Sequence, residues 1–422
     1  MIERVSLFTS KRDLLLFALL SFIILLISLF LEYRAYQKFI VFDSALVDAT
    51  VLKQYVKSKN NRTYQVLKLK SSDGLVFYTT AKKSLQDIKN QEIQLEVWPK
   101  DLDFYKYLTT FYGPSKIIKI NEAKSTKQSL NEFISSSHKE KEITNIYQAL
   151  YTATPLDFKL QKSFSTLGVS HLLAISGFHL GVLSALLFFF LRPIYGYMQD
   201  RFFPYRNSKR DLFVIVGLLL FAYMLFLDSP PSLIRAFGML IVGFVLYDRG
   251  IKIVSMQTLF ITVLLLLSLF PRLFFSLGFW LSASGVFYIF LFLIHFKDLS
   301  KTWQFLLLPL WVYLLMLPFS LAIFENFSIY HPLSIIWTML FTLFYPLSIF
   351  IHFIGFGDIF DPALLWLLNL GKEGVLAGLN QYLFLFYILL SLGAIFSRRV
   401  LYALLLFGCS LFIYAIYHVA QF

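Results

Sequence analysis

The sequence predicts a polytopic α-helical membrane protein with a small all-β, OB-like extracytoplasmic domain inserted after the first transmembrane helix. The 422-residue chain is 58% hydrophobic and only 15% charged, with a mean hydropathy of +0.67. Such a composition suits contact with lipid, which covers apolar surface that water would not. Apolar runs long enough to cross a bilayer recur along the chain, and one polar, lysine-rich segment from about 32 to 168 interrupts them.

The first segment, 1–31, is predicted to be a cytoplasmic tail followed by an anchor helix. Arg4, Lys11 and Arg12 precede an apolar run from Leu14 to Leu31. Cations beside a span stay in the cytoplasm, so the helix exits to the outside. The run does not end in a small-residue cleavage site, which favours a retained anchor over a signal peptide. The protein is therefore expected in the cytoplasmic (inner) membrane, with the next domain facing the periplasm or exterior.

The segment 32–125 is predicted to be the OB-like β domain. Apolar and polar residues partly alternate in five short stretches, 45–56, 63–70, 75–80, 92–98 and 115–120. That period of two is typical of half-buried strands, and the polar stretches 59–62 and 71–74 are turn signals. Five strands suffice for a small barrel of the kind that often holds single-stranded nucleic acid. A structural β domain without a ligand remains the alternative.

Basic and aromatic residues gather around the first predicted hairpin of this domain. This combination is typical of a groove for single-stranded nucleic acid, although a solvated face bearing lysines has the same composition. The candidate contacts are Lys53, Lys57, Lys59, Arg62, Tyr64, Lys68, Lys70 and Tyr78.

The segment 126–168 is predicted to be a helical connector, and 169–422 a multi-span membrane domain. Apolar spans centre near residues 180, 220, 241, 261, 286, 313, 343, 387 and 410, which with the anchor makes about ten. If every span crosses once, Arg398 and Arg399 fall outside, against the positive-inside rule. The Pro-, Gly- and Asp-containing segment 331–375 is therefore expected to hold a broken hairpin or an in-plane helix. The number of spans stays open.

Composition and motifs argue against several classes of site. The formal net charge of +13 is weak evidence for an anionic partner, because cations orient membrane spans. Cys409 is the one cysteine, which excludes an intramolecular disulfide. His171 and His179 are about two helical turns apart, too far to share a metal, and no HExxH or GxSxG motif occurs. No catalytic residue, metal or cofactor is expected.

The stretch HLLAISGFHLG, 171–181, carries many residues that lipid does not favour. Treated as one continuous helix, it places His171, Ser176 and His179 toward one side and small residues on the other. The small residues Ser170, Ala174, Gly177 and Gly181 predict close helix packing. The polar side is expected to face the bundle interior or a water-filled cavity, unless its histidines serve assembly alone.

Four segments of the membrane domain resemble the ComEC-type competence proteins. FSTLGVSHLLAISGFHLGVL, 164–183, resembles the central family motif from Gly168 to Gly181. SPPSLIRAFGML, 229–240, is similar to the Pro-Ser-x-x-Arg-Ala segment that includes Arg235. PRLFFSLGFWLSASG, 271–285, is similar to a third segment that ends at Ser282, with Trp280 in place of the usual Gln. YHPLSIIWTML, 330–340, is a looser match.

The resemblance implies an inner-membrane channel that takes single-stranded DNA into the cytoplasm during natural transformation. The chain resembles the short members that lack a metallo-β-lactamase-like domain, so a nuclease would be a separate protein. Implied partners besides DNA and the lipid bilayer are a ComEA-type periplasmic DNA-binding protein and a ComFA-type or substitute cytoplasmic helicase. A homo-oligomer stays open. The candidate DNA path comprises His171, Ser176, His179, Arg235 and Ser282.

Arg235 is expected about one turn into a helix that begins at Pro231, where it either contacts phosphate or snorkels to the outer interface. Two other functions remain open. One is a membrane-embedded enzyme that uses His171, Ser176 and His179 on a lipid-linked substrate. The other is a secondary transporter of a small anion, although no pair of repeated halves is visible.

Overall fold

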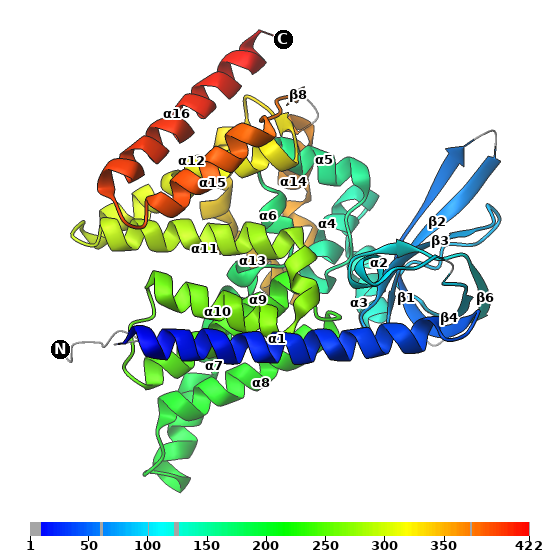
Figure 1. The fold of residues 1–422 in the computed structure, drawn as a ribbon, viewed down its shortest axis with the longest axis horizontal. Coiled ribbons are helices and arrows are strands. Elements are labelled where there is room, and N and C mark those ends of the chain that lie inside the picture. The colour runs from blue at the N-terminus through cyan, green and yellow to red at the C-terminus, as the bar shows by residue number, and fades with distance from the viewer. Residues whose placement is uncertain (1–9, 60–61, 100, 122–125, 372–373, 422) are drawn as a thin grey trace.

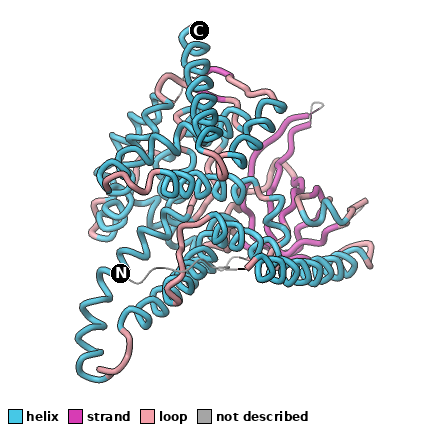
Figure 2. Tube along the Cα trace, turned by 60° about the vertical axis from the view of Figure 1, so that its left-hand side comes forward, coloured by secondary structure: helices cyan, strands magenta, loops and turns pink. Residues whose placement is uncertain are grey.

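The computed structural model describes residues 10–59, 62–99, 101–121, 126–371 and 374–421. Two predicted features, the cation Arg4 and the middle of the turn at 59–62, lie outside these ranges. A bundle of helices occupies most of the molecule and a β domain stands at one end (Figure 1). Turned by 60°, the strands of the β domain remain gathered on one side of the helices (Figure 2). The β domain is thus peripheral to the bundle.

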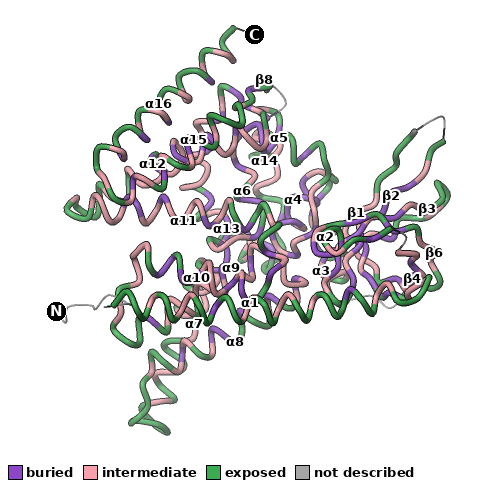
Figure 3. Tube along the Cα trace, in the orientation of Figure 1, coloured by how far each residue is buried: buried purple, intermediate pink, exposed green. Residues whose placement is uncertain are grey.

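Helix α1 (Lys11–Ile40) runs beside the bundle and ends in the β domain (Figure 1). Ser10 caps its first turn by accepting hydrogen bonds from the backbone N–H groups of Arg12 and Asp13. Most of its side chains are exposed, as lipid contact requires (Figure 3). The helix continues past Leu31, where the predicted anchor ends, because Tyr36 is buried in the β-domain core and donates to the carbonyl oxygen of Leu102 at 2.8 Å.

The five predicted strands are confirmed, and a further short strand joins them in one six-stranded sheet. The elements are β1 (Ala45–Lys59), β2 (Arg62–Ser71), β3 (Val76–Ala81), β4 (Glu92–Val97), α2 (Phe104–Leu108), β5 (Phe111–Tyr112) and β6 (Ser115–Ile120), in the sheet order β5-β3-β2-β1-β4-β6. β5 is parallel to β3, and β6 is antiparallel to β4. Gly113 and Pro114 alone separate β5 from β6, so the sheet nearly closes on itself.

The predicted helical connector consists of α3 (Thr126–Ser137) and α4 (Lys141–Thr152), followed by α5 (Phe158–Thr166). Helix α4 buries Ile143, Ile146 and Leu150, which recur at the three- and four-residue spacing of one helix face. These side chains join a core that also contains residues of α13 and α14. The connector is therefore packed into the membrane domain.

Helices fill the remaining chain. They are α6 (Ser170–Leu173), α7 (Gly177–Phe202), α8 (Ser208–Phe226), α9 (Pro231–Asp248), α10 (Met256–Leu269), η1 (Pro271–Phe275), α11 (Leu277–His295), α12 (Lys301–Ile323), η2 (His331–Leu333), α13 (Ser334–Phe353), η3 (Gly357–Phe360), α14 (Asp361–Leu370), α15 (Gln381–Gly393) and α16 (Arg398–Ala420). A helix lies at each predicted span centre. Within the described ranges, however, six helices are long and apolar enough to cross a membrane, namely α1, α7, α11, α12, α13 with η2, and α16, whereas α10 and α15 are apolar but shorter.

The interruption predicted within 331–375 takes the form of a hairpin made by α13 and α14. Strand β7 (Asn326–Phe327) before it pairs antiparallel with β8 (Val375–Leu376) after it, so the chain returns to its starting point. The turn between α15 and α16 then lies at the same end of the molecule as the beginning of α1 and the α11–α12 turn, on the left of Figure 1. Arg398 and Arg399 begin α16 and so lie at this same end.

Candidate functional site

The helix predicted through 171–181 is interrupted, which corrects the continuous-helix prediction. α6 ends at Leu173, and Ala174 and Ser176 adopt extended backbone before α7 begins at Gly177. Ser176 caps α7: its Oγ accepts from the N–H of Phe178, and its own N–H donates to Nδ1 of His179, both at 3.3 Å. Such a reciprocal cap starts a new helix at Ser176. We call the segment 174–176 the α6–α7 break.

The break separates the residues that were expected to share one polar face. His171 is exposed, with Nδ1 3.1 Å from the carbonyl oxygen of Gly168 and Nε2 3.3 Å from Oγ1 of Thr338. His179 is fully buried, and its ring packs edge-on against Tyr345. The two imidazoles therefore have different environments, and the common face predicted from a single helix is wrong.

The predicted stripe of small residues is also not a continuous packed surface among the residues that the structure describes. A Cβ added to Gly181 would meet nothing within 4 Å, and Ala174 is exposed. A Cβ added to Gly177 would lie 3.4 Å from Cβ of Ala236, so α7 and α9 do approach closely there. Ser170 lies in α6 and is partly buried. Close packing is thus local to Gly177, because the break ends the helical periodicity on which the stripe depended.

Arg235 lies in α9 beside the break and is only 3% exposed. Its Nη1 contacts Sδ of Met239 at 3.1 Å, while its Nε is buried without a hydrogen-bond partner. A Cβ on Gly177 would lie 3.7 Å from its Nη2. Ser232 ties the start of α9 to the break by donating to the carbonyl oxygen of Ile175 at 2.6 Å. This burial excludes the snorkelling alternative for Arg235.

The charge of Arg235 is not balanced within the part of the chain that the structure describes. No carboxylate there forms an ion pair with it. Gly177, against which the guanidinium packs, is the first residue of α7, where the helix dipole is positive. Two positive centres at one buried place are unfavourable unless an anion joins them. The arrangement has the chemistry of an anion site.

Further polar atoms on the segments around the break are buried without partners. They are Oγ of Ser170, Nε2 of His179 and Nε2 of His331. Buried polar groups in folded proteins are usually hydrogen-bonded, and each exception calls for a ligand, a water molecule or strain. These atoms give α6, α7 and η2 hydrogen-bonding capacity that the described residues do not use.

His331 is a residue of this region that the sequence did not single out. Its Nδ1 is 3.0 Å from the hydroxyl of Tyr313, and its ring stacks on Phe327. Gly168 has a φ of +71°, and a Cβ there would lie 2.6 Å from the His331 ring. The first glycine of the motif is therefore required both by its backbone and by the imidazole above it. The one signal for His331 was its place in the loose match at 330–340.

Ser282, the remaining candidate for the membrane path, lies in α11 and is partly buried. Helix α11 packs against α9, the helix that carries Arg235. No hydrogen bond joins Ser282 to Arg235 or to the α6–α7 break in the described residues, so its role stays a prediction.

The structure brings most of the β-domain candidates together on one face of the sheet. Lys53 on β1 pairs with Lys68 on β2, which in turn pairs with Tyr78 on β3. The Nζ of Lys68 lies 5.7 Å from the centre of the Tyr78 ring. Lys57 and Tyr64 form another pair on the same face, nearer the tip of the hairpin. We call Lys53, Lys57, Tyr64, Lys68, Lys70 and Tyr78 the basic strand face. Arg62 is exposed at the tip of the hairpin, and the Lys59 side chain lies outside the described residues.

The basic strand face is partly buried against the membrane domain, and this burial disfavours the charged form of its lysines. Burial lowers the pKa of Lys53, Lys68 and Lys70, and the neighbouring Lys68 and Lys89 lower the pKa of Lys53 further. Lys70 donates to the carbonyl oxygen of Asp228 in the α8–α9 turn, and the carboxylate of Asp228 pairs with Lys127 at 2.7 Å. The face therefore leads to the turn that precedes α9 and Arg235.

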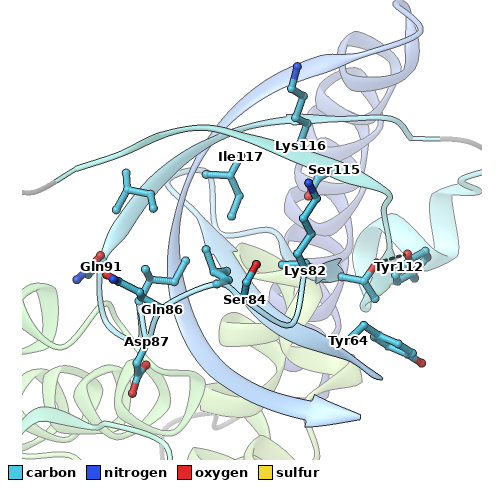
Figure 4. Close-up of a pocket in the computed structure, with 15 residues that line it drawn as sticks. Tyr64, Lys82, Ser84, Gln86, Asp87, Gln91, Tyr112, Ser115, Lys116 and Ile117 are labelled. Atoms are coloured by element: carbon cyan, nitrogen blue, oxygen red, sulfur yellow. Dashed lines mark hydrogen bonds between the residues drawn. The ribbon is translucent and has the colours of Figure 1, made fainter. Parts of the chain in front are cut away.

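A groove with a volume of about 1200 Å³ lies beside the basic strand face, with which it shares Tyr64 (Figure 4). It is bounded by the β3–β4 loop and by β5 and β6, and Lys82, Lys116, Tyr64 and Tyr112 contribute cations and aromatic rings. The Tyr112 and Thr80 hydroxyls are 3.0 Å apart at its edge. Of these residues the sequence singled out Tyr64 alone. Lys82 and Lys116 were missed because they are distant in the chain and come together only through the sheet. Elsewhere in the described residues, no group of three or more His, Cys, Asp or Glu side chains is placed to hold a metal ion.

Comparisons with known proteins agree with the sequence motifs. The model of a family described as "Competence protein" matches residues 153–418, well over half of the chain. A protein of Aquifex aeolicus (strain VF5), described as uncharacterized, is 28% identical over 219 residues, which cover 50% of this chain and 48% of that protein. The chain therefore aligns with about half the length of this relative. No solved structure matches. The matched region contains the α6–α7 break, Arg235 and His331.

Proposed function

This chain belongs to the competence protein family, and from that premise we propose that it forms the membrane passage for a single strand of DNA. Membership of the family indicates a role in DNA uptake during natural transformation. The helices described above indicate a multi-pass membrane protein. The observation that carries the finer proposal is the buried, unbalanced guanidinium of Arg235 at the positive end of α7.

A DNA strand has a negative charge at every phosphate, so it crosses a bilayer only along a path that supplies cations and hydrogen bonds. Arg235 supplies a cation that no carboxylate of the described residues neutralises, and His179 and Ser170, on the two helices that flank the α6–α7 break, supply unused polar atoms. One cation gives a weak, repeatable contact, whereas a cluster would hold the phosphate and stall the strand. The site therefore fits a phosphate in transit better than a resident ligand.

The β domain is proposed to receive the strand before it enters the membrane domain. Its strand pairing supports an OB-like barrel, since β1 joins β2 and β4, and the β5–β6 segment joins β3 in parallel and β4 in antiparallel. The basic strand face ends at the α8–α9 turn and so supplies a cationic route toward Arg235. The groove of Figure 4 offers a second surface with lysines and tyrosines.

We place the β domain outside the cytoplasm. The N-terminal end of α1, the α11–α12 turn with Lys297 and Lys301, and the α15–α16 turn with Arg398 share the end of the molecule opposite the β domain (Figure 1). Cations concentrate on the cytoplasmic side of membrane proteins, which supports this orientation. A ComEA-type protein would then deliver DNA to the β domain, and a ComFA-type or substitute helicase would draw the strand inward.

The proposal is tested by uptake of fluorescent DNA into a strain that lacks this chain. We expect DNA to bind at the cell surface and stay accessible to external nuclease, with entry restored by the wild-type chain supplied in trans. Nuclease-protected DNA in the cytoplasm at the normal level in the deletion strain would refute the passage. An unchanged lipid and glycan profile in the same strain would weigh against the membrane-enzyme alternative.

A further inference from the structure

A chain of hydrogen bonds joins the connector to the α13–α14 hairpin through two histidines. His138 follows α3, and its side chain is fully buried. Its Nδ1 lies 3.0 Å from each carboxylate oxygen of Asp361, the first residue of α14. Its Nε2 lies 3.0 Å from Nε2 of His352, near the end of α13. Nδ1 of His352 lies 2.7 Å from the carbonyl oxygen of Ser348.

These hydrogen bonds require one proton more than two neutral imidazole rings beside an ionised carboxylate provide. A neutral imidazole carries one N–H. The carbonyl of Ser348 only accepts, so Nδ1 of His352 carries a hydrogen, and the Asp361 carboxylate requires the same of Nδ1 of His138. Both Nε2 atoms would then face each other as bare lone pairs at 3.0 Å. A hydrogen bond at that distance needs one additional proton.

The additional proton also balances the charge of the cluster. With it, the two rings together carry one positive charge beside the negative charge of Asp361, so the buried group is neutral overall. Placing the proton on Asp361 instead, with Nε2–H of His138 donating to His352, gives the same count and the same neutrality. Buried charges are stable when they are paired and hydrogen-bonded in this way.

The surroundings of the pair add no competing charge. The titratable side chains that contact it from the described elements are Tyr147 and Tyr151 of α4 and Asp361 of α14. Tyr147 stacks on His138 with ring centres 4.4 Å apart, and the hydroxyl of Tyr151 donates to Oγ of Ser348 at 2.9 Å. Burial raises the pKa of Tyr147 and of Tyr151, so both stay neutral.

Gly357 of η3 closes the remaining side of the pair. A Cβ there would lie 2.8 Å from Cδ2 of His352, so this position has no room for a side chain. The packing thus holds His352 against His138 and leaves little freedom to widen the distance between the two Nε2 atoms without moving an element.

We propose that His138, His352 and Asp361 form a proton-binding site, and that the bound proton holds the connector against the α13–α14 hairpin. His138 belongs to the connector, whereas His352 and Asp361 belong to the hairpin, so the proton bonds two separate parts of the fold. Loss of the proton leaves facing lone pairs and an unbalanced buried carboxylate, which drives the parts apart. The site is independent of the cargo that the membrane domain carries.

The first test is nitrogen NMR of the full-length protein in lipid nanodiscs, with ring-labelled histidine, near neutral pH. The wild type is expected to show an imidazolium signal that both His138→Gln and His352→Gln remove. His295→Gln is the matched control, because His295 is partly buried and, like His352, bonds to a backbone carbonyl oxygen, that of Ala394. A wild type in which both rings are neutral and both carry their hydrogen on Nδ1 would overturn the proposal, whatever the variants do.

The second test is the thermal unfolding midpoint as a function of pH. A proton bound in the fold and released on unfolding stabilises the fold at low pH, and this contribution is lost as the pH rises through the point of release. Asp361→Asn removes the balancing charge and is expected to shift the loss of stability to lower pH. His138→Gln is expected to flatten the curve. Wild type, Asp361→Asn and His138→Gln curves of the same shape would overturn the proposal.

Discussion

Arg235 concentrates the chemistry of the membrane domain in one side chain. Burial of a guanidinium against the positive end of a helix costs free energy that a neutral side chain of similar size would not. A residue kept at such a cost is expected to act on something other than the fold. Stability and function should therefore respond in opposite directions when its charge is removed.

We predict that Arg235→Met lowers DNA uptake at least about tenfold while the protein unfolds at the same or a higher temperature. Loss of a phosphate contact worth about 1.4 kcal/mol is a tenfold change, and replacing a buried charge by an apolar side chain is often neutral or stabilising. Uptake of labelled DNA and the thermal unfolding midpoint of the purified protein are the two measurements.

Arg249→Met is the matched control for Arg235→Met. Arg249 follows the last residue of the same helix, α9, and is exposed. Its replacement should leave both measurements near the wild-type values. Equal uptake in the Arg235 and Arg249 variants would remove Arg235 from the proposed path.

Sequence patterns identified some residues of the sites and missed others for a physical reason. Arg235 and His179 lie in local motifs, so they could be singled out without knowledge of the fold. His138 and Asp361 are 223 residues apart, and His138 and His352 are 214 residues apart. Their contact exists only because α4 packs against the α13–α14 hairpin, and no periodicity in the chain encodes that packing.

At the scale of elements, the α6–α7 break shows how an apolar run conceals a helix start. A reciprocal cap normally has Glu or Gln three residues after the capping Ser, whereas His179 takes that place here. The strands were easier to predict, because alternation along β1 to β4 follows directly from one buried face. Strand β5, with two residues, is too short to show any period, so the near-closure of the sheet was not predictable.

Gly168, which precedes α6 and has a positive φ, gives a second prediction. We expect Gly168→Ala to destabilise the protein by about 2–4 kcal/mol, because a Cβ requires an unfavourable positive φ and also displaces His331. Gly181→Ala, at an open position on α7, should be neutral. Folded yield and thermal midpoint distinguish the two variants, and equal values would contradict the placement of His331 over Gly168.

At the scale of the whole molecule, the β domain, the connector and the bundle meet through charged contacts. Arg272 of η1 pairs with Glu32 of α1 at 2.7 Å and lies over the ring of Tyr107 in α2. On the other side, Lys70 and Lys127 both reach Asp228. These contacts hold the basic strand face toward the membrane domain, where a strand bound on it would be near α9.

We predict that replacing both Lys53 and Lys68 by Gln weakens binding of single-stranded DNA without lowering the unfolding midpoint. Both have a lowered pKa, which means that the fold disfavours their charged forms and loses no stability when the charge is removed. In the wild type, binding should also weaken at a lower pH than an ordinary lysine would require. Fluorescence anisotropy with labelled DNA measures both effects.

Lys38→Gln with Lys119→Gln is the control for that pair, because both lysines are exposed and lie away from the basic strand face. The two double variants carry the same net charge. If they weaken binding equally, the interaction is a general attraction between a cationic protein and DNA, and the face has no special role.

The pairing of β7 with β8 makes the direction of α15 and α16 independent of what lies in the hairpin between the two strands. Since the chain departs and arrives at one place, residues within the α13–α14 hairpin can be added or lost in evolution without reversing the direction in which α15 and α16 enter the bilayer. The length of the hairpin therefore does not decide the direction in which the last two helices run.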